Sequence, residues 1–401
     1  MCGILGYLSS TKKIYISEFS SMLYKLKHRG QDSCGISILK NSNLETIKDN
    51  NFDNLNDVIY RHYNTSFNSL LGHVRYITSS KDVPIIQPCK STNTLGDYSL
   101  IFNGNIPTHL YKEYENYTSD TQLILDFLNK NTNKHVLWET LLDDFMNTFR
   151  RSYSLIIQTK YGFYIIRDRV GVRPLYYLKK SKDTYIFSSE SCVFTKEEID
   201  NNELVEVKSG EIISLKNGLI VKSQFNPKNK YLSEAHCLFE YIYFLKKESS
   251  FENIAVVDYR YSVGEKMGLL DRKYFNELHK VNKNEPIVIG IPKTGNDYAN
   301  SYADSVGLPF KEYIVKKKGV GRTFILKNNE ERTKISMRKY IFDERLKGKD
   351  VILVDDSLVR GVTMRTLITQ LTVFGVSDIH IRIMSPPVIS PCNYGIDIPT
   401  K

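Results

Sequence analysis

The segment Val351–Thr363, VILVDDSLVRGVT, constrains the fold more than any other part of this sequence. It predicts a short apolar strand, a polar turn that contains glycine, and then the beginning of a helix. The same order of strand, loop and helix occurs earlier in the C-terminal half. Strands that are joined through helices in this way belong to a parallel sheet, so this half is predicted to be α/β. The expected strands are Pro286–Ile291, Asp350–Val354 and Ile379–Met384, and the expected helices are Asp297–Val306 and Met364–Phe374.

The N-terminal half has a different rhythm, in which short Ile, Leu, Tyr and Phe runs alternate with Gly, Asn, Asp and Ser. One helix is expected from Ser17 to a stop at Gly30. Asn41–Asn56 is rich in Asn and Asp and predicts a surface loop. The change of rhythm predicts two domains, residues 2–230 and 231–401. The short runs predict largely antiparallel strands, at Ser69–Ile77, Tyr98–Phe102, Ser152–Ile157, Gly162–Arg167 and Thr184–Phe187.

Several classes of protein are excluded by composition. No run approaches about 18 apolar residues, so a membrane-spanning helix is not expected. The start, MCGILGYLSS, lacks the basic and apolar regions of a secretory signal. Six scattered cysteines without a CxxC pair indicate neither a disulfide scaffold nor a zinc ribbon, and they favour a cytoplasmic protein. The net charge of +10 is dispersed, so an anionic small substrate explains it as well as nucleic acid does.

The turn after the strand at Asp350–Val354 has the chemistry of an anion site. Asp355 and Asp356 end the strand, and the N–H groups of the following turn, together with the helix dipole, can cradle a phosphate. Paired acids beside a phosphate suit ribose hydroxyls or a Mg²⁺ ion. The alternative is an ordinary turn with a capping Asp, but the compact grouping of two acids with Ser, Arg, Gly and Thr favours the phosphate site.

Cys2 directly follows the initiator methionine. A small second residue normally permits removal of that methionine, which would leave Cys2 with a free α-amine beside its thiol. Such an amine can act as the general base for its own nucleophile. The alternative is that the segment is a first strand with a buried cysteine, since free cysteine is commonly buried.

The surrounding motifs decide between these alternatives. In order along the chain they resemble the N-terminal-nucleophile glutamine amidotransferases, which implies an α+β sandwich of αββα layers over residues 2–230. The motifs are MCGILGYL at Met1–Leu8, RGQDS at Arg29–Ser33, GHVRYITSS at Gly72–Ser80, FNGNI at Phe102–Ile106, TSDTQ at Thr118–Gln122, RDRVGVRPL at Arg167–Leu175 and SSES at Ser188–Ser191.

This resemblance implies roles for residues that match those motifs. Cys2 is the expected nucleophile, and Asn103 and Gly104 are the expected oxyanion hole. His73 is expected to be structural, and Cys34 stands where this family usually has Ala. The residues expected to bind glutamine are Arg29, Arg75, Tyr76, Thr78 and Asp120, with Arg75 on its α-carboxylate and Asp120 on its α-ammonium.

The C-terminal half resembles the type I phosphoribosyltransferases, which bind phosphoribosyl pyrophosphate (PRPP). Asp355 and Asp356 match the acids that hold the ribose hydroxyls, and they could also hold Mg²⁺. Lys293, Gly319 and Val362 depart from the residues usual in that family. The other implied PRPP ligands are Thr294 and Gly295 of the pyrophosphate loop, Lys316 and Arg322 of a lid at Val315–Ile325, and Ser357, Arg360, Gly361, Val362 and Thr363 of the 5-phosphate loop.

Together the halves resemble the amidophosphoribosyltransferase family, whose members make 5-phosphoribosylamine from glutamine and PRPP as the first step of purine biosynthesis. The resemblance implies Mg²⁺, a homo-oligomer and inhibition by purine nucleotides, and we expect the domain at 231–401 to lack the family's C-terminal helices. One branch binds a [4Fe–4S] cluster through four cysteines. Cys237 and Cys392 match two of them, so we expect vestigial cysteines and no cluster.

Two alternatives differ in class. A degenerate paralogue would bind PRPP, regulate or only hydrolyse glutamine, and it should have lost Cys2, Asn103, Asp355 or Asp356; none is lost. A transcription regulator on the transferase fold should carry an added nucleic-acid-binding module, and none is visible. We therefore expect an enzyme with no nucleic-acid partner.

Overall fold

The computed structural model describes residues 1–60, 64–76, 85–216, 219–224, 234–279, 285–317, 340–396 and 398. The chain divides into two compact units. Unit 1 contains Met1–Cys237 and Cys392–Ile396, and unit 2 contains Leu238–Pro391 and Asp397–Lys401. The boundary expected between residues 230 and 231 lies outside the described residues.

Unit 1 is built on two antiparallel sheets. One has the strand order β13-β11-β12-β1-β6-β3-β4 and the other β15-β14-β10-β9-β8-β7. Their bounds are β1 Gly3–Ser9, β3 Ser33–Lys40, β4 Asn43–Asp49, β6 Ser69–Arg75, β11 Tyr176–Ser181, β12 Thr184–Ser188 and β13 Glu203–Glu206 in the first, and β7 Cys89–Asn93, β8 Gly96–Asn105, β9 Ser152–Thr159, β10 Gly162–Arg167, β14 Glu211–Lys216 and β15 Leu219–Gln224 in the second. The short strands β2 (Ile14–Tyr15) and β5 (Ser66–Phe67) form a separate pair.

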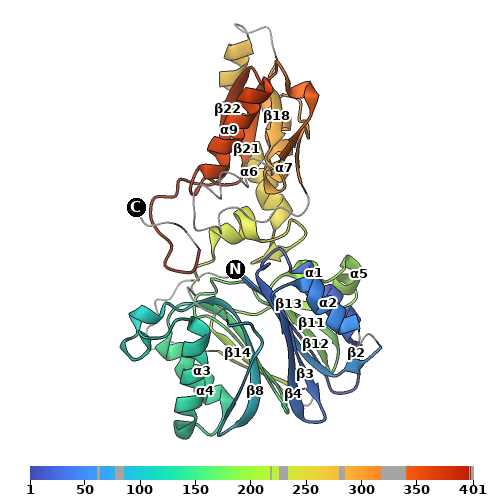
Figure 1. The fold of residues 1–401 in the computed structure, drawn as a ribbon, viewed down its shortest axis with the longest axis vertical. Helices are drawn as coiled ribbons and strands as arrows, with labels where there is room; N and C mark the ends of the chain where they lie inside the picture. The colour runs from blue at the N-terminus through green and yellow to red at the C-terminus, as the bar shows by residue number, and fades with distance from the viewer. Residues whose placement is uncertain are drawn as a thin grey trace. The chain divides into compact units, whose positions relative to one another are not determined.

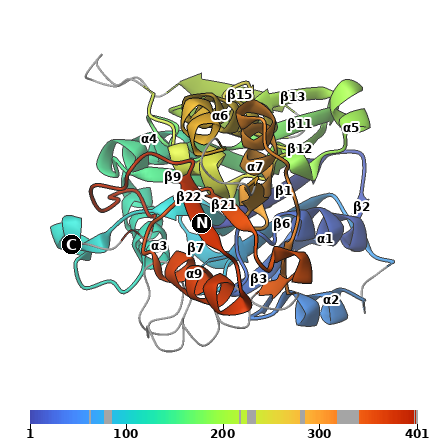
Figure 2. The same ribbon diagram turned by 90° about the horizontal axis from the view of Figure 1, so that it is seen from above.

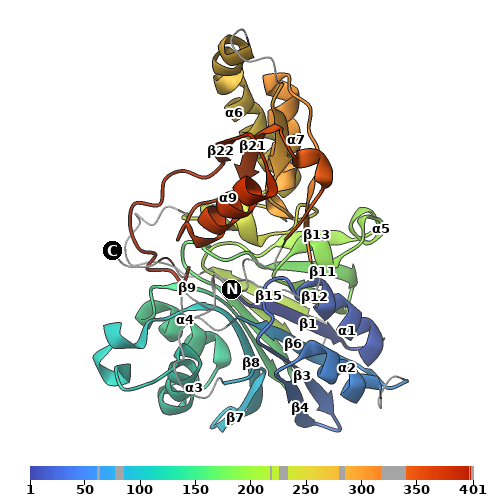
Figure 3. The ribbon, with the colours of Figure 1, turned by 45° about the horizontal axis from the view of Figure 1, so that its top comes forward.

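Helices cover the outer face of each sheet, which gives four layers (Figure 1). Helices α1 (Ile16–Lys25) and α2 (Phe52–Tyr60) lie side by side over the first sheet (Figure 3). Helices α3 (Asp120–Lys130) and α4 (Trp138–Thr148) share a core with the second sheet. A third core lies between the two sheets. The αββα sandwich predicted from the sequence is therefore confirmed.

Strands at the centre of this sandwich are buried on both faces. In β1, Ile4 belongs to the core between the sheets, whereas Leu5 and Tyr7 belong to the core under α1 and α2. Side chains alternate between the faces of a strand, so an almost continuous apolar run is needed to fill both cores. Unit 1 also contains the short helix α5 (Lys196–Asp200) and the 3₁₀ turns η1 Thr108–Leu110, η2 Lys112–Tyr114, η3 Asn131–Lys134 and η4 Ser191–Val193.

The surface loop expected at Asn41–Asn56 is wrong. The segment contains β4 and the first residues of α2. Asn41 and Ser42 both have positive φ, 49° and 65°, and they close a two-residue turn between the paired Lys40 and Asn43. Asn and Asp tolerate that conformation. The polar residues that begin this segment therefore belong to a hairpin turn and an edge strand rather than to a loop.

A short C-terminal piece of the chain completes unit 1. The Ser152 hydroxyl donates to the backbone oxygen of Tyr394 at 2.9 Å, and the Arg173 guanidinium donates to the same oxygen. Gly395 has a φ of 92°, and a Cβ there would lie 2.5 Å from the Cβ of Asn105. The piece therefore docks beside the last residue of β8.

Unit 2 is centred on a parallel sheet with the order β18-β21-β22, as the sequence predicts. Its strands are β18 Ile287–Gly290, β21 Asp350–Asp355 and β22 Asp378–Ile383. Helix α9 (Val362–Phe374) covers one face of the sheet, and helices α6 (Val256–His279) and α7 (Thr294–Val306) cover the other (Figure 2). The other elements among the described residues of unit 2 are the π-helical turn η5 Glu240–Phe244, the 3₁₀ turn η7 Glu344–Leu346, and two strand pairs, β16 Ser250–Phe251 with β17 Ile254–Ala255 and β19 Ile314–Lys316 with β20 Tyr340–Phe342.

Helix α7 begins three residues before the expected start, so the expected pyrophosphate loop overlaps its first turn. Both helices that follow sheet strands end at a left-handed glycine, Gly307 after α7 and Gly375 after α9. Among the described residues, no helix is both long and apolar enough to cross a membrane.

Candidate active sites

Unit 1 brings Cys2 and Arg75 to neighbouring strand ends. Cys2 precedes β1, and Arg75 is the last residue of β6; these strands are antiparallel, with Gly3 opposite Val74. The Cys2 backbone N–H donates to the Asn103 Oδ1 at 3.1 Å, and the Cys2 thiol donates to the backbone oxygen of Tyr76 at 3.8 Å. The cysteine is therefore held on both sides while its side chain stays partly exposed.

Asn103 and Gly104 lie at the end of β8, in the opposite sheet. The Asn103 side chain is fully buried, and its Nδ2 has no hydrogen-bond partner within the described parts of the chain. A Cβ on Gly104 would lie 2.2 Å from the backbone oxygen of Ser152, so only glycine fits there. This arrangement offers an unused amide donor beside the thiol, as an oxyanion hole requires.

The RGQDS motif connects the Cys2 and Arg75 positions. The buried Arg29 donates through Nε to the backbone oxygen of Cys2 at 3.0 Å. Gly30 packs against the backbone of Arg75, since a Cβ would lie 2.5 Å from its carbonyl carbon. The Asp32 N–H donates to the Arg75 backbone oxygen at 2.9 Å. The motif therefore fixes both residues at once.

Arg75 and Asp120 form a buried pair of opposite charges near Cys2. They are 4% and 6% exposed. Burial raises the pKa of Asp120 to about 6; the Arg75 cation opposes this shift and Cys2 adds to it. Within the described residues, the Nη1 of Arg75 has no hydrogen-bond partner. A guanidinium donor and a carboxylate thus remain for the two charged groups of a free amino acid.

Two further side chains support this site, and one of them was not predicted. Burial and the Arg75 cation lower the pKa of His73 to about 3, so its ring is neutral and ties β6 to the backbone oxygen of Phe102 at 3.2 Å. Gln87 accepts from the Phe102 N–H at 2.7 Å and donates to the Thr121 hydroxyl at 3.1 Å. Gln87 joins the strand of Asn103 to the helix of Asp120, and its sequence surroundings carry no signal for this role.

The RDRVGVRPL motif is part of the scaffold. The buried Asp168 carboxylate accepts backbone N–H groups of Val170, Gly171, Val172 and Tyr153 at 2.8–3.3 Å. Tyr153 is the residue paired with Gly104 across β8 and β9. The motif therefore holds the strand next to the candidate oxyanion hole.

In unit 2 the predicted PRPP residues gather at the carboxyl ends of the parallel strands. Asp355 is the last residue of β21, and the buried Asp356 follows it. The Asp356 N–H donates to the Asp355 carboxylate at 3.0 Å, and the Ser357 hydroxyl donates to the Asp356 carboxylate at 2.6 Å. This edge of an open parallel sheet is the usual place for ligands.

The start of α7 is packed against the same strand end. Gly290 lies opposite Val354 in the sheet, and the Ile291 N–H donates to the Val354 backbone oxygen at 2.8 Å. A Cβ on Gly295 would lie 2.6 Å from that oxygen. Thr294 and Gly295 therefore lie beside the acid pair.

Two helices begin at this sheet edge without a side-chain cap. Gly361, with a φ of 71°, precedes α9, and the exposed Lys293 precedes α7. The peptide bond between Pro292 and Lys293 is cis. Arg360, Val362 and Thr363 surround the start of α9 and are partly exposed. Uncapped N–H groups at a helix start favour phosphate.

The lid residues are described only in part. Lys316 ends β19, directly opposite Tyr340 of β20. Burial raises the pKa of the Tyr340 phenol, and the nearby Asp355 and Asp356 add to the shift. Thr78, Gly319 and Arg322 lie outside the described residues.

The residues missed by sequence reasoning include a buried carboxylate beside the Cys2 site. Glu190 is fully buried and accepts the Arg29 Nη1 at 2.6 Å and the His28 Nε2 at 2.7 Å. Burial alone would raise its pKa, but His28 and Arg29 outweigh that effect and hold it well below its usual range. The only signal was an acid inside the serine-rich SSES motif.

Comparison with known protein families agrees with this division into two sites. A family described as a glutamine amidotransferase domain matches residues 75–196, and one described as a phosphoribosyl transferase domain matches residues 265–384.

Several relatives are similar over the whole chain. The amidophosphoribosyltransferase of Methanocaldococcus jannaschii is 33% identical, covering 100% of this chain and 87% of that protein. The human amidophosphoribosyltransferase is 29% identical, covering 100% and 82%. The solved glutamine PRPP amidotransferase of B. subtilis, complexed with ADP and GMP, superimposes with a TM-score of 0.81 at 26% identity, covering 100% of this chain and 85% of that one.

Proposed function

This chain belongs to the amidophosphoribosyltransferase family, and from that premise we propose how its residues divide the reaction between two sites. The protein is a glutamine-hydrolysing pentosyltransferase that uses PRPP at the first committed step of purine biosynthesis. Glutamine and PRPP react with water to give 5-phosphoribosylamine, glutamate and pyrophosphate. The assignment of residues to steps below is our proposal.

Glutamine hydrolysis takes place at Cys2. After removal of Met1, the α-amine takes the thiol proton while the Sγ bonds to the amide carbon of glutamine. Asn103 Nδ2 and the Gly104 N–H stabilise the resulting oxyanion, each by about 3 kcal/mol. The intermediate collapses, the proton passes to the leaving nitrogen, and ammonia departs. Water then hydrolyses the thioester to glutamate and restores the thiol. The buried, unpartnered Asn103 amide beside Cys2 is the observation that carries this assignment.

Arg75 and Asp120 select free glutamine. The guanidinium binds the α-carboxylate and the carboxylate binds the α-ammonium, while Arg29 holds the Cys2 backbone. Tyr76 belongs to the same glutamine site, because its backbone oxygen accepts a hydrogen bond from the Cys2 thiol. Thr78 is assigned to this pocket by family resemblance.

The raised pKa of Asp120 predicts a pH dependence of glutamine binding. Burial raises this pKa to about 6, so the carboxylate gains a proton as the pH falls through 6 and no longer attracts an ammonium group. We expect the KM for glutamine to rise about tenfold for each pH unit below 6, while the KM for ammonia, expressed as the concentration of unprotonated NH3, does not follow this curve. A KM for glutamine that stays constant between pH 5 and 7.5 would contradict the role of Asp120.

Transfer takes place at the sheet edge of unit 2. Asp355 and Asp356 hold the ribose hydroxyls, and the residues at the start of α9 hold the 5-phosphate: Ser357, Arg360, Gly361, Val362 and Thr363. Thr294 and Gly295 at the start of α7, with Lys316 and Arg322 of the lid, hold the pyrophosphate. Ammonia then bonds to C1 of the ribose as the C1–O bond to pyrophosphate breaks, and the new amine releases a proton.

Mg²⁺ accompanies PRPP as part of the substrate. Carboxylate oxygens are the donors that this ion prefers, and two carboxylates, Asp355 and Asp356, lie next to each other at the end of β21, so the residues fit the ion. Bound there, Mg²⁺ would spread the charge of the leaving pyrophosphate. ADP and GMP are bound in the B. subtilis relative, and we propose that purine nucleotides regulate this protein, which we expect to be a cytoplasmic homo-oligomer.

One coupled assay tests the proposal. Glutamate and pyrophosphate release are measured with each substrate alone and with both. We expect slow glutamate release from glutamine alone, and stoichiometric release of both products when both substrates are present. Glutamate release that PRPP does not change, with no pyrophosphate formed, would instead identify a glutaminase or a degenerate paralogue.

We predict that the protein contains no iron–sulfur cluster. A [4Fe–4S] cluster ordinarily needs four thiolates, and four of the six cysteines are unsuited to that role. Burial raises the pKa of Cys34 to about 12 and of Cys89 to about 11, so neither is a thiolate. Cys2 is the nucleophile, and Cys192 donates to Glu190 at 3.4 Å. Only Cys237 and Cys392 match the family's cluster ligands. Protein purified without oxygen should be colourless by visible absorption and contain less than about 0.2 iron per chain; about four would show that another chain completes the site.

A further inference from the structure

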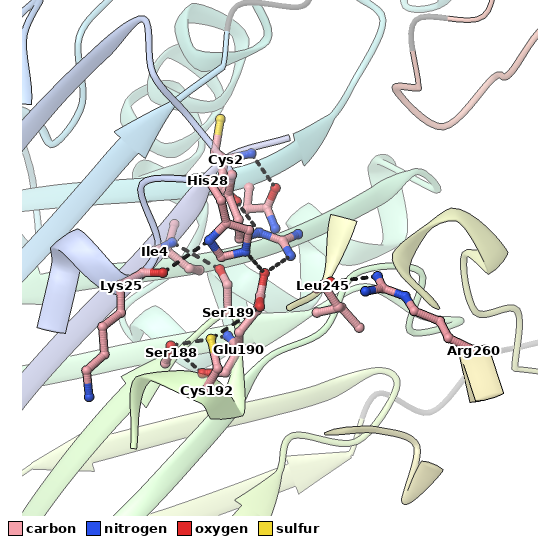
Figure 4. Close-up of polar contacts among 12 residues, drawn as sticks. Cys2, Ile4, Lys25, His28, Ser188, Ser189, Glu190, Cys192, Leu245 and Arg260 are labelled. Atoms are coloured by element: carbon pink, nitrogen blue, oxygen red, sulfur yellow. Dashed lines mark hydrogen bonds and ion pairs between the residues drawn. The ribbon is translucent and has the colours of Figure 1, made fainter. Parts of the chain in front are cut away.

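We propose that Glu190 is a positioning residue for the Cys2 nucleophile, acting through Arg29. The inference rests on the proposed function of Cys2 and adds a residue to which no role has been assigned. Three hydrogen bonds carry it, and Figure 4 shows them around Cys2, His28 and Glu190.

The contacts form a short relay of buried groups. Glu190 Oε1 accepts the Arg29 Nη1 at 2.6 Å, and the Arg29 Nε donates to the Cys2 backbone oxygen at 3.0 Å. Both side chains of this ion pair are fully buried. His28 donates to the same Glu190 oxygen at 2.7 Å, and its side chain is 21% exposed. The carboxylate therefore sets the place of the guanidinium that holds Cys2.

The backbone around Glu190 is fixed to the strand that carries Cys2. The Ser189 N–H donates to the Ile4 backbone oxygen, and the Ile4 N–H donates to the Ser189 hydroxyl, both at 3.0 Å. Ser188 lies opposite Leu5 in the ladder. The position of Glu190 is thus set by the same two strands that set the position of Cys2.

Cys2 needs this support because of its place in the chain. Once Met1 is removed, a single peptide bond connects Cys2 to β1. Its nitrogen then depends on Asn103, and its carbonyl depends on Arg29. A displacement of about 1 Å between reacting groups can cost about a hundredfold in rate. Removing the Glu190 charge takes a fully buried carboxylate partner away from Arg29, which favours movement of the guanidinium towards other acceptors.

The test compares Glu190→Gln with the unaltered protein in glutamine hydrolysis and in ammonia-driven synthesis. We expect kcat for hydrolysis to fall about 30-fold, with the KM for glutamine within threefold, because Arg75 and Asp120 still bind substrate. Ammonia-driven synthesis should stay within twofold, which also reports that the variant is folded.

A second readout separates positioning from a general structural role. Within the described residues, the charged groups near the Cys2 amine are Arg29 after α1, Arg75 at the end of β6, Asp120 at the start of α3, and Glu190 through Arg29; His73 is neutral. At saturating glutamine, Asp120 is paired with the ammonium group of the substrate. The fall of kcat at low pH, which is the acidic limb of its pH profile, therefore reports protonation of the Cys2 α-amine. In Glu190→Gln the loss of the carboxylate charge beside Arg29 should move this limb about half a pH unit lower. Glu190→Asp keeps the charge, so the limb should stay in place while kcat partly recovers.

Glu206→Gln is the matched control, because Glu206 accepts the buried Arg167 Nη1 at 3.1 Å in the same unit without a contact to Cys2. It should leave kcat and its pH profile unchanged. A Glu190→Gln enzyme with kcat within twofold, or with the loss confined to KM, would overturn the proposal. An active Cys2→Ala enzyme would instead refute the proposed nucleophile, so the two failures are distinguishable.

Discussion

Cys2→Ala is expected to lower glutamine-dependent synthesis of phosphoribosylamine by about a thousandfold or more, because it removes the thiol whose own backbone N–H is held by Asn103 Oδ1. Synthesis driven by high concentrations of ammonia should stay within about twofold, since the residues assigned to PRPP belong to unit 2. Both activities are measured as pyrophosphate release in the same preparation.

Cys34→Ala provides the control for this substitution. Cys34 is buried in β3, its thiol donates to the backbone oxygen of Asp49 at 3.7 Å, and relatives usually carry Ala there. Both activities should survive in that variant. If Cys2→Ala still uses glutamine while Cys34→Ala does not, the assignment of the nucleophile is wrong.

The double substitution Asp355→Asn and Asp356→Asn is expected to lower phosphoribosyl transfer by about a thousandfold with either nitrogen source. Asparagine keeps the size of each side chain but removes the charges that hold ribose hydroxyls and Mg²⁺, and hydrogen bonds to charged groups contribute about 1.5–3 kcal/mol each. Calorimetry should show at least a hundredfold weaker binding of PRPP. Glutamine hydrolysis without PRPP should remain, and its stimulation by PRPP should disappear.

Asp378→Asn tests whether any acid in the sheet would matter equally. Asp378 lies at the start of β22, opposite Asp350, and therefore at the other end of the sheet. Its substitution should leave PRPP affinity unchanged. Normal PRPP affinity in the double variant, measured at the same Mg²⁺ concentration, would rule out the acid pair as the ribose site.

Local pattern predicted much of the fold. The strand at Gly162–Arg167 has the predicted bounds, because every position is apolar or small until Arg167. The helices α7 and α9 end where glycine was expected to stop them. The hairpin at Asn41–Asn56 was missed, since its turn residues resemble those of a loop and its strand is half exposed.

The site was predicted where motifs carry the chemistry and missed where tertiary contacts create it. Cys2 directly precedes β1, whereas Arg75 and Asn103 belong to β6 and β8, and their meeting point could be expected only from the family resemblance. Gln87 and Glu190 owe their roles to partners that are distant in sequence, at Thr121 and Arg29. A single sequence gives no local pattern for such long-range pairs.

Unit 1 is completed by residues that are synthesised after the main run of unit 2. Arg173 is fully buried, yet its acceptor at Tyr394 follows only after the whole run from Leu238 to Pro391. At about 5–20 residues per second, a ribosome adds those roughly 150 residues in about 8–30 seconds. During that interval the nascent amidotransferase unit lacks the segment Cys392–Ile396 beside β8, while unit 2 is free to begin folding. Completion of the strand end that carries Asn103 thus follows synthesis of residues Leu238–Pro391, and it ties maturation of the glutamine site to successful translation of the transferase.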